Sequence, residues 1–386
     1  MNAPAGKKQL SLRRRLLFAS ALPLVAFGLG EVAVRLTKPS TDLWVDTGRA
    51  PGPDPMSRWA DLDAFCAYRG RPGVYGGEGG EPRKTINSEG FISTPELSPE
   101  KPPGRVRIAF LGGSSVAGVS PVLPDEETWP WQCMQLLRAE HPELDLDFLN
   151  AALAGHNSFE TYGRLWSRVR FFQPDVVVVC HGWNDFYYWH HEPMDRIQNW
   201  RTRPDGSWSW EKTQRVLEPS WVDHLIWPSQ LLVKVRWQLA NARQAHGESG
   251  QDLGMDPDFD PRAPAVYRDN LRLHAAAADT LGFDLFGCEE ATIVTPGLSP
   301  EWQARCQFSW HGFDYPAHVR AYEAVNRTLR EVLGEERTIS MQEVSGRTEL
   351  FHDHVHPTSE GARRIAEVVA RRLSAHLREG RGASSR

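Results

Sequence analysis

Four loops of the sequence hold residues whose types could together transfer an acyl group through a serine. The candidates are Ser114 and Ser115, Gly155, Asn184 with Asp185, and Asp353 with His356. Acyl transfer needs a nucleophile, a general base, a carboxylate that orients the base, and hydrogen-bond donors for the oxyanion. The loops hold a candidate for each of these roles.

The segments next to these loops predict the elements that would position them. Short apolar runs alternate with helical stretches from about residue 105 onward, which is typical of βαβ units and a parallel sheet. Strands are expected at 106–111, 146–151, 176–180, 284–288 or 291–294, and 337–341, and helices at 127–139, 266–282, 320–334 and up to about Leu377. Active sites of open parallel sheets form at the carboxyl ends of the strands, where three of the loops fall.

The four loops, in order, resemble the four motifs of the SGNH/GDSL family of serine hydrolases. The matching segments are 110-FLGGSSVAG-118, 149-LNAALAGHNS-158, 182-GWND-185 and 353-DHVHP-357. The resemblance covers about 105–377. It implies an α/β fold of the flavodoxin-like, doubly wound type with a parallel sheet of about five strands.

The resemblance also implies a role for each residue. Ser114 would be the nucleophile, His356 the general base and Asp353 the carboxylate that orients it. The oxyanion would be held by the backbone N–H groups of Ser114 and Gly155 and by the Asn184 side chain. Neither a cofactor nor a metal is implied. One residue departs from the family motif: Gly113 stands where an Asp is usual.

Each candidate also has a structural interpretation. Serine, glycine and Asn-Asp pairs are common in turns and helix caps. Ser115 is a rival nucleophile, although we expect it to bond locally at the start of the following helix. The run 352-HDHVH-356 could also hold a metal through His352, His354 and His356. The motifs in their joint order favour the catalytic interpretation.

The rest of the chain divides by composition. The predicted segments are a basic cytoplasmic segment over 1–15, a signal anchor or transmembrane helix over 16–36, a Pro/Gly-rich linker or arm over 37–104, a hydrolase domain over 105–377 with a Trp-rich insertion over 186–264, and a disordered tail over 378–386. We assign the arm no catalytic role. The insertion is expected to be a lid or a binding surface, with a small satellite core as the alternative.

The amino terminus predicts the location of the protein. Basic residues at 7–15 precede an uncharged apolar run over 16–30. This order favours an uncleaved signal anchor, with a cleaved signal peptide and a buried helix as alternatives. Basic residues before the span would keep the amino terminus in the cytoplasm and the hydrolase domain on the periplasmic or extracellular side. Cleavage would instead give a secreted protein.

Charge and cysteine usage indicate which partners and which compartment to expect. The net charge is −5, and no basic stripe follows the first forty residues, so we expect no nucleic-acid partner. The five cysteines include no CxxC pair, and a Cys288–Cys306 disulfide would be compatible with export.

Together these features predict an extracytoplasmic serine esterase that hydrolyses or transfers an acyl ester. Because tryptophan rings could pack on sugar rings, an O-acetylated glycan is the first substrate expected, and a lipid or small ester the second. The alternative is a non-catalytic glycan-binding or scaffolding module that retains the fold.

Overall fold

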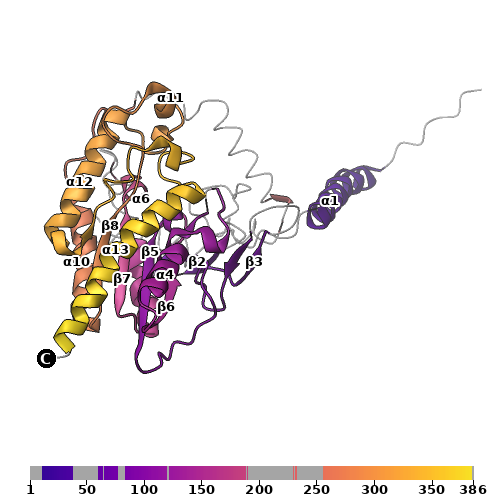
Figure 1. Cartoon of the computed structure of the whole chain (residues 1–386). Coiled ribbons are helices and arrows are strands. Elements are labelled where there is room, and N and C mark those ends of the chain that lie inside the picture. Colours follow the sequence, from indigo (N-terminus) through magenta and orange to yellow (C-terminus); the bar gives the residue numbers. More distant parts are fainter. Residues whose placement is uncertain are drawn as a thin grey trace, which may run out of the picture. The chain divides into compact units, whose positions relative to one another are not determined.

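The computed structural model describes most of the chain outside the Trp-rich insertion. The described residues are 11–37, 60–63, 65–76, 83–119, 121–187, 189, 229, 231–232 and 255–384. The chain divides into two compact units, residues 1–57 with 214–252 and residues 58–213 with 253–386. The second unit contains all four loops (Figure 1).

A sheet of five parallel strands forms the centre of the second unit. Its order is β6-β5-β7-β8-β9. The strands are β5 (Arg105–Gly112), β6 (Asp145–Asn150), β7 (Val176–His181), β8 (Asp284–Glu289) and β9 (Thr338–Ile339). The first strand therefore lies inside the sheet, and the chain winds away from it in both directions. The prediction of an α/β fold with about five parallel strands is confirmed.

Helices cover both faces of the sheet (Figure 1). One layer is made by α4 (Trp129–Glu140) and α13 (Ser359–Ser384), and the other by α5 (Ser158–Ser167), α10 (Ala263–Leu281) and α12 (Tyr315–Leu333). The short α3 (Ser114–Ala117), α6 (Trp183–Phe186) and α11 (Pro300–Gln303) lie in loops, as do the 3-10 turns Asp125–Glu127, Val169–Phe172, Phe308–Trp310, Glu335–Arg337 and Thr348–Leu350.

The sequence explains where these helices begin. The Asn157 side chain accepts hydrogen bonds from the first turn of α5, and Glu160 completes a capping box there. The Asp314 side chain caps α12 by accepting the Ala317 N–H at 2.9 Å. α13 runs to Ser384, beyond the Leu377 end that the sequence predicted, so residues 378–384 of the expected disordered tail are helical.

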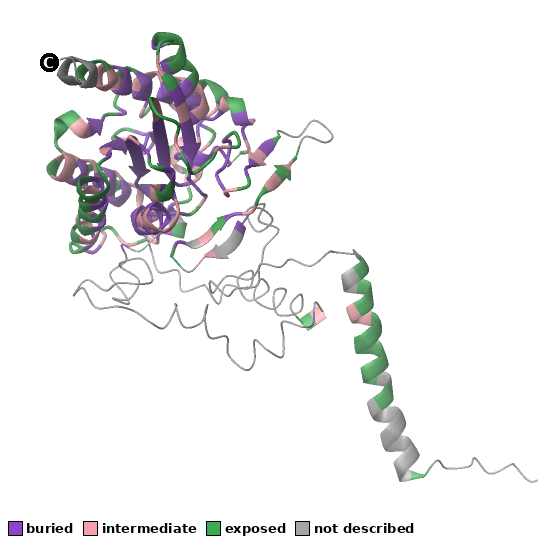
Figure 2. Cartoon of the chain, turned by 90° about the horizontal axis from the view of Figure 1, so that it is seen from below, coloured by how far each residue is buried: buried purple, intermediate pink, exposed green. Residues whose placement is uncertain are grey.

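The core follows the two-residue period of the strands. Leu111, Val177 and Val179 belong to the cluster shared with α5, α10 and α12. Phe110, next in sequence to Leu111, turns to the other face and meets Trp129 of α4 edge-on, with ring centroids 5.3 Å apart. Figure 2 shows the strands of the five-stranded sheet as largely buried.

The segment expected as an arm packs on the sheet domain where it is described. It forms two antiparallel hairpins, β1 (Ala60–Asp63) with β2 (Ala67–Gly70) and β3 (Gly73–Tyr75) with β4 (Lys84–Ile86). The fully buried Lys84 donates to the Ala117 carbonyl of α3 at 3.4 Å. Arg164 of α5 donates to the Gly90 carbonyl at 2.7 Å. These buried bonds make the described part of the arm, from residue 60 onward, part of the unit that holds the site.

The described part of the first unit is mainly α1 (Leu12–Thr37), which contains the predicted 16–36 helix. The Glu31 carboxylate accepts hydrogen bonds from Ser229 Oγ at 2.8 Å and the Leu231 N–H at 2.9 Å. Among the described residues, no helix combines the length and apolarity needed to cross a membrane, so the predicted transmembrane helix finds no support there.

Two further predictions concern the insertion and the cysteines. Within the insertion, Trp189 is described and is buried against Phe186 and Phe259. The six other tryptophans that suggested a lid or binding surface, at positions 200, 208, 210, 221, 227 and 237, lie outside the described residues. Cys288 and Cys306 are free thiols, so the disulfide considered for them is not formed.

Candidate active site

The nucleophile turn joins β5 to α3 through two crowded glycines. A Cβ on Gly112 would lie 2.4 Å from Val116 Cγ2, and one on Gly113 would lie 2.4 Å from Asn184 Nδ2. Both distances are too short for real Cβ contacts, so a side chain at either position would have to displace a neighbour. Ser114 follows directly and begins α3, at the carboxyl end of a central strand.

Ser114, His356 and Asp353 form one hydrogen-bonded chain. His356 Nε2 lies 2.7 Å from Ser114 Oγ, and His356 Nδ1 lies 2.7 Å from Asp353 Oδ2. The two histidine nitrogens therefore contact opposite partners, as a general base between a nucleophile and an orienting carboxylate requires. The structure brings together the three residues that the resemblance assigned to the triad.

The Asp353 carboxylate is fixed by its own loop. Its Oδ1 accepts the backbone N–H groups of Val355 and His356, both at 3.0 Å. Burial raises the pKa of Asp353, but the hydrogen bond and positive charge offered by His356 outweigh it and hold that pKa well below the usual range. The carboxylate thus stays ionised at neutral pH, which suits the stabilisation of an imidazolium.

The predicted oxyanion donors lie beside this triad. Asn184 Nδ2 donates to the His156 carbonyl at 2.9 Å, and His156 follows Gly155 directly. The amide carries two hydrogens, so this bond fixes the side chain while one N–H stays available. No acceptor within the described part of the chain takes the backbone N–H of Ser114 or Gly155. Three donors are therefore available near the nucleophile turn.

Comparisons with known proteins find similarity to solved structures. No protein-family model matches the chain, and no curated protein does. A solved structure described as a GDSL-like lipase from Parabacteroides merdae is similar over 72% of this chain and 98% of its own, with 16% identity and a TM-score of 0.40. Axe2, an acetylxylan esterase from Geobacillus stearothermophilus, is similar over 69% of this chain and 94% of its own, with 15% identity and a TM-score of 0.40.

A structure of TesA is similar over 69% of this chain and 97% of its own, with 17% identity and a TM-score of 0.39. The first of these three structures is described by the name of the family that the four sequence motifs resemble.

The Ser115 hydroxyl has a different hydrogen-bond partner from the one expected. It is buried, and its Oγ donates to Glu290 Oε1 at 3.1 Å, so it bonds across the fold rather than locally. Glu290 also accepts the Trp183 N–H at 2.6 Å and so links the turn after Ser114 to the start of α6. Burial raises the pKa of this carboxyl. Ser115 is thus held away from the position that Ser114 occupies beside His356.

Sequence reasoning missed Glu290, although a signal was present. The residue directly follows β8, at the same sheet edge as the predicted site residues. An acidic residue at the end of a parallel strand satisfied the criterion that selected the other candidates. Its side chain contacts the supports of the site rather than the triad.

The residues that could hold a metal in the histidine run differ from the three histidines predicted. Within the described residues, the group with metal-ligand spacing is Asp353, His354 and His356, and the exposed His352 is not part of it. His354 is buried with its ring centroid 3.7 Å from that of Trp183, and burial lowers its pKa to about 3. The two other members are already bound to each other in the triad.

Asp185, next to Asn184, supports the second loop. It is buried, and it accepts the Ser158 hydroxyl at 2.5 Å and the Ser158 N–H at 3.2 Å. Burial is the main cause that raises the pKa of Asp185 to about 7. This carboxyl joins the loop after β7 to the start of α5, so it positions both oxyanion loops.

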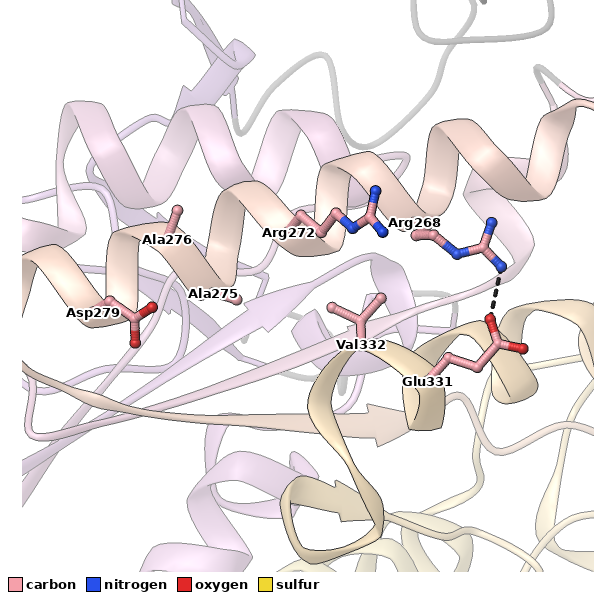
Figure 3. A pocket seen from close by; sticks show the side chains of 7 residues that line it. All are labelled: Arg268, Arg272, Ala275, Ala276, Asp279, Glu331 and Val332. Atoms are coloured by element: carbon pink, nitrogen blue, oxygen red, sulfur yellow. Dashed lines mark hydrogen bonds and ion pairs between the residues drawn. The ribbon is translucent and has the colours of Figure 1, made fainter.

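A surface hollow of about 480 Å³ lies elsewhere, between α10 and α12 (Figure 3). Its lining residues are Arg268, Arg272, Ala275, Ala276, Asp279, Glu331 and Val332. Arg268 pairs with Glu331 at 2.7 Å, and Arg272 pairs with Asp269 at 3.2 Å. The hollow contains no triad residue, and both arginines in it are neutralised by carboxylates.

Proposed function

We propose that this chain is a serine esterase of the SGNH/GDSL type, acting through an acyl-Ser114 intermediate. The observation that carries the proposal is the continuous chain from Ser114 Oγ through His356 to Asp353, with 2.7 Å at each contact. A turn serine or a capping histidine would not need this pairing. The loops that meet here are separated by 242 residues.

The reaction follows from this geometry. His356 Nε2 takes the Ser114 proton as Oγ attacks the ester carbon, and the oxyanion forms toward the Ser114, Gly155 and Asn184 donors. His356 then gives the proton to the leaving alcohol, which departs and leaves the acyl group on Ser114. A water loses a proton to His356 and attacks the acyl carbon, and His356 then returns the proton to Ser114 Oγ as the acid is released. A second alcohol in place of water would give acyl transfer.

For the substrate, we propose an O-acetyl group on a glycan. Besides the composition of the insertion, two described aromatic residues support this choice. Tyr187 directly follows α6, and Trp310 lies 6.4 Å from it with 42% of its surface exposed. Exposed aromatic faces suit sugar rings. Trp310→Ala is expected to raise KM for acetylated xylo-oligosaccharides and to leave KM for an aryl acetate unchanged.

We also propose that the enzyme works outside the cytoplasm. The order of basic residues at 7–15 and an uncharged run over 16–30 supports export, either anchored or secreted after cleavage. Fractionation of cells that express the full chain is the test. Recovery only in the cytosolic fraction would contradict the proposal.

The activity test uses the full chain, an aryl acetate and matched alanine variants of the adjacent serines. Ser114→Ala is expected to lower kcat by more than about 10³-fold and to abolish labelling by a fluorophosphonate. Ser115→Ala should keep both the wild-type kcat and the labelling by the fluorophosphonate. The reverse result would move the nucleophile to Ser115. A wild-type protein without hydrolysis or labelling would favour the non-catalytic binding module.

A further inference from the structure

Tyr68 lies on β2, in the arm to which the sequence assigned no catalytic role. Its hydroxyl donates a hydrogen bond to the carbonyl oxygen of Ala154. Its own carbonyl accepts one from His156 Nε2 at 3.2 Å, and the two rings lie 4.7 Å apart between centroids. Tyr68 therefore holds the residues on both sides of Gly155.

The bond to Ala154 fixes the direction of an oxyanion donor. The Ala154 carbonyl and the Gly155 N–H belong to one planar trans peptide, so they point in opposite directions. A hydroxyl that holds the carbonyl from one side therefore orients the N–H to the other. Without this bond, the peptide plane could rotate and turn the donor away from the oxyanion.

Gly155 itself matches this arrangement. Its φ of +76° lies in the left-handed region that favours glycine, and a Cβ would lie 2.7 Å from the Tyr68 hydroxyl. The tyrosine thus occupies the space that a side chain at 155 would need. The glycine of the second motif and Tyr68 of the arm form one close-packed unit.

The second donor is fixed to the same loop. Asn184 Nδ2 bonds to the His156 carbonyl at 2.9 Å, and His156 is held by Tyr68 through its ring. Two of the three oxyanion donors therefore depend on a loop of three residues that one arm residue holds in place.

We propose that Tyr68 is a positioning residue for the oxyanion hole, so that the arm completes the active site. This inference rests on the proposed esterase function. Tyr68 acts through the 154–156 loop, where it contacts Ala154 and His156. Small displacements of such donors are costly, since a shift of about 1 Å can lower the rate about 10²-fold.

The test compares Tyr68→Phe with Tyr75→Phe in the full chain. Tyr75 belongs to the same arm, and its hydroxyl donates to the Arg71 carbonyl at 2.8 Å, away from the 154–156 loop. Tyr68→Phe is expected to lower kcat for an aryl acetate by about 10- to 100-fold with little change in KM. Tyr75→Phe should keep wild-type kinetics. The unfolding midpoint of each variant shows whether it is folded at the assay temperature.

A double-mutant cycle separates positioning from a general effect on stability. In the Asn184→Ala background one of the two dependent donors is already absent, so Tyr68→Phe should cost less there than in the wild type. A folded Tyr68→Phe variant with kcat within twofold of wild type, alongside an inactive Ser114→Ala, would overturn this inference and leave the esterase function intact. A wild-type protein without esterase activity would overturn both.

Discussion

A methyl group added at Gly113 is expected to disable the oxyanion hole without touching the triad. The backbone there has φ −90° and ψ −154°, which other residues adopt, so strain is not the cause. The added Cβ would lie 2.4 Å from Asn184 Nδ2, and the amide must retreat by about 1 Å or more for the contact to become ordinary. Displacement or loss of one such donor lowers kcat by about 10²-fold or more.

Steady-state hydrolysis of an aryl acetate by four proteins tests this reasoning: wild type, Gly113→Ala, Asn184→Ala and the double variant. Asn184→Ala removes the clashing atom, and the next atom near the added Cβ is the His156 carbonyl oxygen at 3.4 Å. Gly113→Ala should therefore lower kcat about 100-fold in the wild type and less than about threefold in the Asn184→Ala background. Equal losses in both backgrounds would refute the steric explanation.

The same geometry predicts the outcome of restoring the residue that the family usually has. Gly113→Asp carries the same Cβ and a carboxylate beside the oxyanion donors, so it should lower kcat at least as much as Gly113→Ala. Wild-type activity in Gly113→Asp would show that the Asn184 amide is free to move, contrary to its bond with His156.

Three other changes test the supports of the site. Between about pH 4 and pH 7 native Asp185 keeps a proton that the unfolded chain has lost, so the free energy of unfolding should fall by up to about 4 kcal/mol as pH rises through that range. Asp185→Asn should flatten this slope in urea titrations, and an unchanged slope would contradict the assignment. Glu290→Gln puts an amide where three donors converge, from Ser115, Trp183 and Tyr322, and should destabilise the fold by about 1–3 kcal/mol. Ser115→Ala should cost less in the same thermal melts, and the opposite ranking would argue against a shared acceptor. Asp353→Asn should lower kcat by about 10³- to 10⁴-fold while the protein stays folded, and a loss below tenfold would remove it from the triad.

The sheet and the triad loops were predictable because they depend on local patterns. A run such as 176–180 predicts a buried strand by its own composition, and parallel strands bring their carboxyl ends to one edge of the sheet. The spacing of Asp353 and His356 likewise fits within one loop. These features need no knowledge of distant contacts.

The features that sequence reasoning missed depend on contacts between distant segments. Ser115 bonds to Glu290 rather than to its own helix, across 175 residues. α13 extends past Leu377, where Arg378 pairs with Glu140 of α4, a contact that the composition of the tail does not reveal. Local propensity cannot predict such partners, because they are set by how the elements pack.

The unusual glycine at 113 and the overlooked arm are connected through one loop, residues 154–156. The Asn184 amide fills the space beside Gly113 because its bond to the His156 carbonyl holds it there. His156 is in turn fixed by Tyr68, 88 residues earlier in the chain. A larger residue at 113 would thus push against the Asn184 amide and strain its bond to the loop on which the tyrosine packs. Gly113 therefore lies beside an amide whose position depends on a loop that the arm holds, and variants at 113 and 68 should affect the same step of the reaction.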